Sequence, residues 1–160
     1  MNRRSILTSS VISALGWTLL GAGDSALAAD PTIAGTWELN VAASKSTDPM
    51  PKSITRVYEI IGNSEKLTGT VVTADGKTIP IGFTATLDGK DSPSHNPGVD
   101  TVVLTPIDAF RVDYVTKLKD KVVYSGTRIL SNDGKSMTLT AKGLNLAGQP
   151  MEQTMVYDRR

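Results

Sequence analysis

A three-residue unit, Asp-Gly-Lys, occurs three times in this chain, at residues 75–77, 88–90 and 133–135. Asp-Gly accepts the positive backbone φ angles that a tight hairpin turn requires and that most other residues resist. Residues 62–64 (Gly-Asn-Ser) and 119–121 (Lys-Asp-Lys) have the composition of further turns. Turn signals at this spacing favour a chain of short antiparallel strands.

The segments between these turns alternate in polarity. From Thr78 to Leu87, apolar residues occupy every second position, which is the period of a half-buried strand. The pattern predicts strands over residues 33–41, 54–61, 66–73, 78–87, 101–105, 110–117, 122–130, 136–142 and 149–157. Because short strands joined by tight turns must protect their edges, we expect an all-β fold, a single antiparallel up-and-down β-barrel of about 8–10 strands.

Residues 1–28 have the three parts of a secretory signal peptide. Arg3 and Arg4 form its basic start, residues 6–22 are mostly apolar, and Ala-Leu-Ala at 26–28 fits the small-residue cleavage rule. An uncleaved membrane anchor is the alternative, but Ser, Thr and Gly residues interrupt the apolar stretch, which is too polar for a stable span.

Cleavage after Ala28 predicts a mature chain that begins at Ala29, with Asp30 as the alternative start. We therefore expect a signal peptide at 1–28 and one β-barrel domain at 29–160, periplasmic or secreted and not inserted in a membrane. Adjacent arginines also occur in twin-arginine signals, so the Sec and twin-arginine routes both remain open. Cleavage leaves 15 basic and 15 acidic residues of the 17 and 16 in the whole chain, and hence no net charge.

The composition excludes several kinds of site. The chain has no cysteine, so disulfides, thiolate metal sites, cysteine nucleophiles and a lipoprotein anchor are impossible. The one histidine, His95, lies between prolines and is interpreted as a solvated loop residue. A balanced charge argues against a nucleic-acid partner. We predict no metal, no cofactor and no catalytic residue, and the oligomeric state stays open.

Polar side chains within the predicted strands are the candidate ligand-binding residues: Arg56, Tyr58, Tyr114, Tyr124 and Arg128. If their faces point inward, phenol and guanidinium groups lie inside the barrel, where a ligand carboxylate would partner a buried arginine. The other interpretation is that these faces point to solvent while Val57 and Ile61, or Val123 and Ile129, pack in the core. Both faces of each strand carry apolar residues, so alternation leaves the choice open, and the usual exposure of arginine favours solvent.

The first predicted strand contains Gly35-Thr36-Trp37. A Gly-x-Trp at this position, followed by antiparallel hairpins, resembles the lipocalin and calycin barrels. The resemblance implies that Trp37 plugs the closed end and that Arg159 or Arg160 packs across its indole, with Gly35 beside it. Guanidinium stacking on an indole face is physically favourable.

More closely, the chain resembles a family of small exported bacterial lipocalin-like proteins, mostly uncharacterised. The matching segments are Gly35–Trp37, Leu87–Pro93, Asp100–Val102 and Ser131–Thr138. The resemblance implies a fold rather than a chemistry.

Three functions fit these observations. The first is an exported barrel that binds a small hydrophobic or amphipathic molecule in its cavity. The second is a packed barrel that acts as a protein-interaction or envelope-maintenance module. The third is a metal-free enzyme of the isomerase or cyclase type, which would need a buried carboxylate with a perturbed pKa beside Tyr58, Tyr114 or Tyr124. Whether the chain is an enzyme stays open, and we favour a binding function.

Overall fold

The computed structural model describes residues 32–160. The predicted signal peptide and the predicted start of the domain at residue 29 lie outside this range. Within residues 32–160, no helix is long and apolar enough to span a bilayer. Export and cleavage therefore remain sequence predictions.

The described chain is built from eleven strands and one short 3-10 turn, and the predicted all-β fold is confirmed. The nine predicted strands are all present, with ends shifted by at most two residues. They are β1 (Gly35–Leu39), β3 (Ser53–Ile61), β4 (Ser64–Val72), β5 (Thr78–Thr86), β7 (Thr101–Pro106), β8 (Arg111–Leu118), β9 (Lys121–Leu130), β10 (Ser136–Leu144) and β11 (Pro150–Arg159). Three elements were not predicted: η1 (Val41–Ala43), β2 (Lys45–Ser46) and β6 (Asp91–Pro93).

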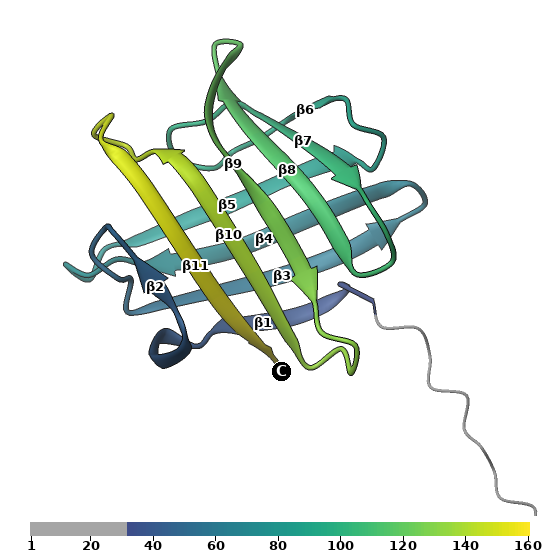
Figure 1. The fold of residues 1–160 in the computed structure, drawn as a ribbon, viewed down its shortest axis with the longest axis horizontal. Helices are drawn as coiled ribbons and strands as arrows, with labels where there is room; N and C mark the ends of the chain where they lie inside the picture. Colours follow the sequence, from purple (N-terminus) through teal and green to yellow (C-terminus); the bar gives the residue numbers. More distant parts are fainter. Residues whose placement is uncertain (1–31) are drawn as a thin grey trace, which may run out of the picture.

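The strands form one antiparallel meander in the order β5-β4-β3-β1-β11-β10-β9-β8-β7-β6, with β2 paired to β11 off this path. In Figure 1, strands β7 to β11 cross in front of β3, β4 and β5, and β1 joins the two layers at the bottom. Trp37 of β1 lies opposite Arg56 of β3 on one side and Arg159 of β11 on the other. The first strand thereby closes the barrel against the last one.

A seam between β5 and β6 closes the other side of the barrel. An isolated bridge joins Phe83 to Ser94, and the His95 amide donates to the Gly82 carbonyl at 2.8 Å. A side chain completes the seam, because the amide of Gly82 donates to Oδ1 of Asn96 at 2.9 Å. The barrel is therefore nearly closed. Between β5 and β6, a side-chain hydrogen bond takes the place of part of the regular main-chain pairing.

The predicted turns have the expected backbone geometry. The glycines of the three Asp-Gly-Lys units have φ angles of 89°, 74° and 66°. The two residues that join β8 and β9, Lys119 and Asp120, have φ angles of 49° and 63°, as both central residues of a type I′ turn must. The local turn chemistry thus agrees with the overall topology.

The closed end of the barrel is organised around Trp37, which is completely buried. Its indole Nε1 donates to the Ile33 carbonyl at 2.8 Å, and the Arg159 guanidinium carbon lies 4.3 Å from the ring centre. Gly35 leaves room for Arg159, because a Cβ there would lie 2.7 Å from its Nη1. Arg160 instead pairs with Glu38 on the exposed surface. Of the two arginines considered from the sequence, Arg159 is the one that stacks on the indole.

Candidate functional site

The end of the barrel opposite Trp37 is open. A cleft of about 550 Å³ lies there between the loop before β3, the β4–β5 hairpin, the loop after β6 and the β10–β11 hairpin. In Figure 1 these connections lie at the left and upper edges of the molecule. Apolar side chains dominate the walls of this mouth: Pro49, Pro51, Ile54, Val71, Ile79, Ile81, Pro97 and Leu146.

A smaller chamber of about 70 Å³ continues from the mouth into the barrel. The two spaces share part of their lining: Arg56, Asn96, Tyr124, Gln153, Met155 and Tyr157. These residues therefore form the floor of the mouth and the roof of the chamber. The chamber holds only a few water-sized groups, so the space for a larger molecule lies in the mouth.

Arg56 occupies this boundary between the two spaces. Strand β3 directs it inward, where its Nε donates to the Tyr157 hydroxyl at 3.1 Å and its Nη1 donates to the Tyr58 hydroxyl at 3.2 Å. Burial opposes its charge, but the two phenol groups outweigh that effect and hold its pKa above the ordinary value. The guanidinium is therefore a cation at the floor of the mouth.

No described carboxylate forms an ion pair with Arg56. Among residues 32–160, its Nη2 also has no hydrogen-bond partner. Burial raises the pKa of Tyr157, so the phenol beside Arg56 stays neutral at ordinary pH. Arg56 is thus a half-buried cation with neutral neighbours, and its unpaired Nη2 donors are reached by solvent.

Arg128 is deeper in the barrel and has a full partner. Its Nη1 and Nη2 donate to the two carboxylate oxygens of Glu65 at 2.5 and 2.6 Å, and Glu65 is completely buried. The Arg128 guanidinium carbon also lies 5.2 Å from the centre of the Tyr58 ring. Tyr58 therefore lies between the two arginines, and one polar network connects β4, β9, β3 and β11.

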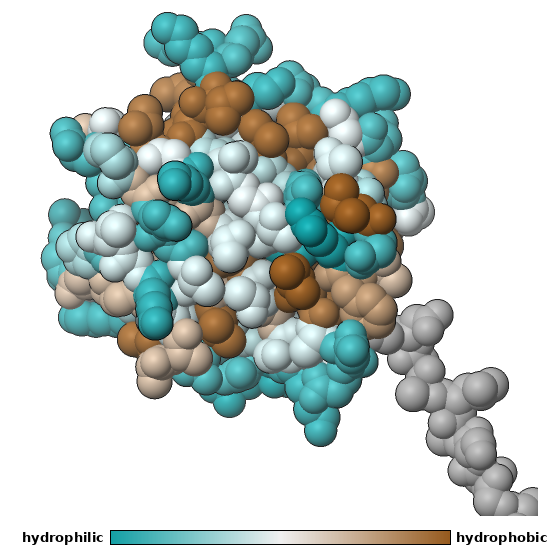
Figure 2. Space-filling view, in the orientation of Figure 1, coloured by the Kyte–Doolittle hydropathy of each residue, from teal (hydrophilic) through white to brown (hydrophobic). Residues whose placement is uncertain are grey.

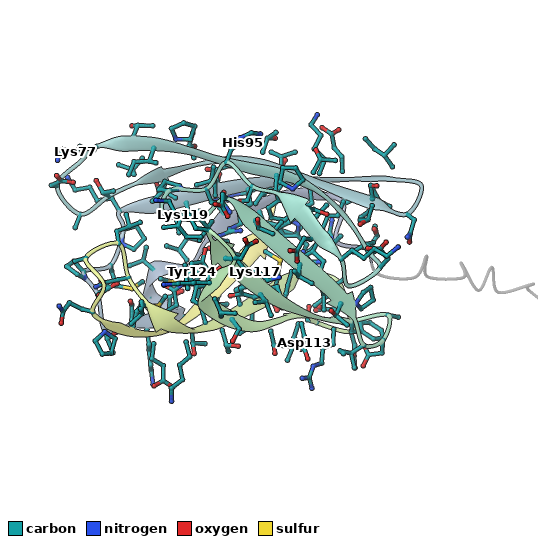
Figure 3. The ribbon with its side chains drawn as sticks, turned by 90° about the horizontal axis from the view of Figure 1, so that it is seen from above. Lys77, His95, Asp113, Lys117, Lys119 and Tyr124 are labelled. Carbon is teal, nitrogen blue, oxygen red and sulfur yellow. The ribbon has the colours of Figure 1, made fainter. Side chains whose placement is uncertain are left out.

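Tyr114 and Tyr124 complete the interior. Their rings meet edge to face with centres 6.4 Å apart, and Figure 3 shows Tyr124 between the two layers of strands while Asp113 projects outward. The Tyr114 side chain lies over Gly126, where a Cβ would come within 2.8 Å of the phenol oxygen, and its hydroxyl donates to the Thr140 carbonyl at 2.6 Å. Burial raises the pKa of both phenols, which makes them neutral hydrogen-bonding groups rather than bases.

The structure brings all five candidate residues, Arg56, Tyr58, Tyr114, Tyr124 and Arg128, into the lining of the inner chamber. The expectation that the arginine faces point to solvent is wrong. Of the four residues that would pack in the core under that expectation, Ile61 and Ile129 have exposures of 59% and 46%, and Val57 and Val123 are half-buried. The physical reason is that the Glu65 carboxylate pairs with Arg128 and two phenols accept hydrogen bonds from Arg56, which lowers the cost of turning these arginines inward.

Sequence reasoning missed four polar residues of the interior: Glu65, Asn96, Thr116 and Gln153. A signal for Glu65 exists, because it is in phase with Leu67 and Val71 on the inward face of β4. The predicted strand began one residue later, at Lys66, and therefore left Glu65 out. His95, by contrast, is exposed as expected.

The interior contains one buried carboxylate near the tyrosines, as an enzyme of the isomerase type would require. Arg128 engages both oxygens of that carboxylate, so Glu65 is an ion-pair partner and not a free base. Within residues 32–160, no group of three or more His, Cys, Asp and Glu side chains could hold a metal ion. The described polar groups of the site are hydrogen-bond donors and acceptors together with the charge of Arg56.

The outer surface around the mouth carries exposed apolar side chains. Leu118, Val122, Leu144 and Leu146 have exposures of 41–72%, and they lie at the ends of β8 to β10 or in the hairpin that follows. Figure 2 shows apolar side chains gathered along this upper edge, with smaller apolar groups scattered lower on the same face.

No family model and no curated protein matches this chain. Solved structures with a similar arrangement include the zebrafish ileal bile acid-binding protein in complex with cholic acid, with 12% identity and a TM-score of 0.46 over 79% of this chain and 98% of that one. The siderocalin Ex-FABP has 12% identity and a TM-score of 0.41, over 80% and 70% of the two chains. Lobster apocrustacyanin A1 has 11% identity and a TM-score of 0.41, over 79% and 60%. At this level of similarity, none of their ligands is transferred to this chain.

Proposed function

We propose that this protein binds a small amphipathic molecule in its barrel, with an anionic group of the molecule against Arg56 and an apolar part in the mouth. The observation that carries this proposal is the half-buried Arg56, which has no carboxylate partner at the floor of the mouth. Partial burial of a cation has a desolvation cost that an opposite charge or several hydrogen bonds offset. An anionic ligand would supply both through the unused Nη2 donors.

The shape of the site supports an orientation with the charged group inward. Arg56 lies at the floor, the walls above it are mostly apolar, and the chamber below it measures only about 70 Å³. Of the two spaces that Arg56 borders, the mouth is the one with room for an apolar chain, where burial of its surface contributes roughly 25 cal/mol per Å².

The direct test is a binding measurement with a long-chain carboxylate and the corresponding neutral alcohol. We expect the carboxylate to bind more tightly and Arg56→Gln to remove that preference. Loss of one charge-assisted hydrogen-bonding partner predicts about a tenfold to hundredfold weaker affinity for the carboxylate. Arg111→Gln is the matched control, because Arg111 pairs with Asp113 on the exterior and should not affect binding.

Two results would contradict the proposal. One is that neither probe binds, and native mass spectrometry finds no small molecule on protein purified from its natural host. The other is that the carboxylate and the alcohol bind equally well to both the unmodified protein and Arg56→Gln.

A protein-interaction module is the second candidate, and the exposed apolar residues around the mouth favour it. In that case, substitution of Val122 by Ser would weaken a complex with a partner protein. It would leave small-molecule binding unchanged, since Val122 does not line the mouth.

We also propose that the chain is exported and that its first 28 residues are removed. Mass measurement of the protein recovered outside the cytoplasm tests this proposal: a mature chain beginning at Ala29 or Asp30 supports it, and an intact Met1 contradicts it.

A further inference from the structure

We infer that Glu65 sets the charge that the barrel accepts, and that the bound molecule carries a single negative charge. This inference rests on the proposed function and deepens it. It concerns the balance of charge inside the barrel rather than the single contact with Arg56.

The charged side chains that line the inner chamber are few. Among its described lining residues, Arg56 and Arg128 are the only charged ones, and Glu65 lies directly against Arg128. All other side chains that line the chamber are neutral or are tyrosines. With one carboxylate against two guanidinium groups, the interior is left with one positive charge.

The two arginines contact the same tyrosine from different sides. Arg56 Nη1 donates to the Tyr58 hydroxyl at 3.2 Å, and the Arg128 guanidinium carbon lies 5.2 Å from the centre of the same tyrosine ring. If Glu65 did not neutralise Arg128, an anion at Arg56 would therefore have a second cation on the far side of Tyr58, within the barrel interior where charges are screened less than in water.

Among the described residues that line the mouth, Arg56 is the only positively charged one. The charged side chains there other than Arg56 are Asp48 and Asp75, of which Asp75 pairs with Lys77. A dianion in the cavity would leave one negative charge without compensation. Its desolvation cost rises with the square of its charge, while its attraction to Arg56 only doubles, so a monoanion should bind better.

Octyl sulfate and octyl phosphate provide a matched pair of probes, because both have the same chain and a tetrahedral head. At about pH 8, the sulfate ester carries one negative charge and the phosphate ester nearly two. We expect the unmodified protein to bind octyl sulfate at least about tenfold more tightly, the size of effect that one unit charge has at an effective dielectric constant of about 20.

Two variants test the role of Glu65 itself. Glu65→Gln raises the interior charge by one and should shift the preference toward octyl phosphate by about tenfold or more. The double variant Glu65→Gln/Arg128→Gln removes both partners and keeps one positive charge, so its preference for octyl sulfate should match that of the unmodified protein. Calorimetry gives the affinities, and circular dichroism verifies that each variant is folded.

The outcomes separate the two proposals. If neither probe binds the unmodified protein, the proposed function fails and this inference falls with it. If octyl sulfate binds but Glu65→Gln leaves the preference unchanged, only the inference fails. If Glu65→Gln does not fold, Arg128→Gln takes its place: it lowers the interior charge by one, so octyl sulfate should bind at least about tenfold more weakly than to the unmodified protein, and an unchanged affinity overturns the inference.

Discussion

Substitution of Arg159 by Met should destabilise the barrel far more than the same change at the next residue. The Arg159 guanidinium donates to the carbonyl of Gly134 at 2.6 Å, to that of Ala34 at 2.7 Å and to that of Thr32. It also covers the face of Trp37 at 4.3 Å. One side chain thus connects β11 with the segment before β1 and with the β9–β10 hairpin.

The size of the effect follows from these contacts. The three hydrogen bonds, two of them half-buried and one exposed, contribute about 0.5–1 kcal/mol each. The cation–π contact with the indole adds about 0.5–2 kcal/mol. Methionine keeps the apolar stem, so we expect a loss of about 2–5 kcal/mol in the free energy of unfolding. For a domain of this size, that loss lowers the melting temperature by roughly 10 °C or more.

The assay is thermal unfolding followed by circular dichroism, with urea unfolding as a second measure of stability. Arg160→Met is the matched control, because Arg160 is exposed and pairs only with Glu38; its melting temperature should equal that of the unmodified protein. Equal melting temperatures for the two variants would refute the argument that Arg159 holds the closed end together.

Three further predictions concern the interior and the mouth. Burial raises the pKa values of Tyr114, Tyr124 and Tyr157, so the unfolded chain releases these protons first. The free energy of unfolding should therefore have its full value below about pH 10 and decrease above it, by up to about 1.4 kcal/mol per pH unit for each tyrosine. A urea midpoint that does not change between about pH 9 and pH 11 would contradict this. Gly126→Ala places a Cβ within 1.8 Å of a carbonyl oxygen on the neighbouring strand and should cost about 3 kcal/mol in urea unfolding, whereas an unchanged midpoint would show that the strands move apart freely. Leu146→Ser should leave the melting temperature unchanged, because Leu146 is 72% exposed, but should weaken binding of a long-chain carboxylate about fivefold; equal affinities would place the apolar chain elsewhere.

The strand meander could be predicted from the sequence because the two features that determine it, alternation of polarity and turn residues, are local. Alternation sets which residues share a face, and Asp-Gly or Lys-Asp sets where the chain reverses, so the nine longer strands could be predicted within two residues. The seam between β5 and β6 could not. It depends on Asn96 reaching the Gly82 amide from 14 positions away, and a contact of that kind leaves no periodic trace in the sequence.

The interior polar network was only half predictable for a related reason. The spacing of Arg56 and Tyr58 shows that they share a face, but the direction of that face depends on partners from other strands. Glu65 decides the matter for Arg128, since its carboxylate turns an unfavourable burial into an ion pair. Long-range pairing of this kind becomes visible only when the strands are placed side by side.

The same network bears on how the chain finds its correct strand register. A slip of one residue between β3 and β4, or between β9 and β10, would turn every side chain of the slipped strand to the other face. Apolar residues occur on both faces of these strands, so hydrophobic burial alone discriminates weakly against such a slip. Arg128 and Glu65 discriminate strongly, because a slipped strand would leave one of the two charges buried without its partner. We therefore expect the ion pair to contribute more to the choice of strand register than to the net stability of the correctly paired barrel.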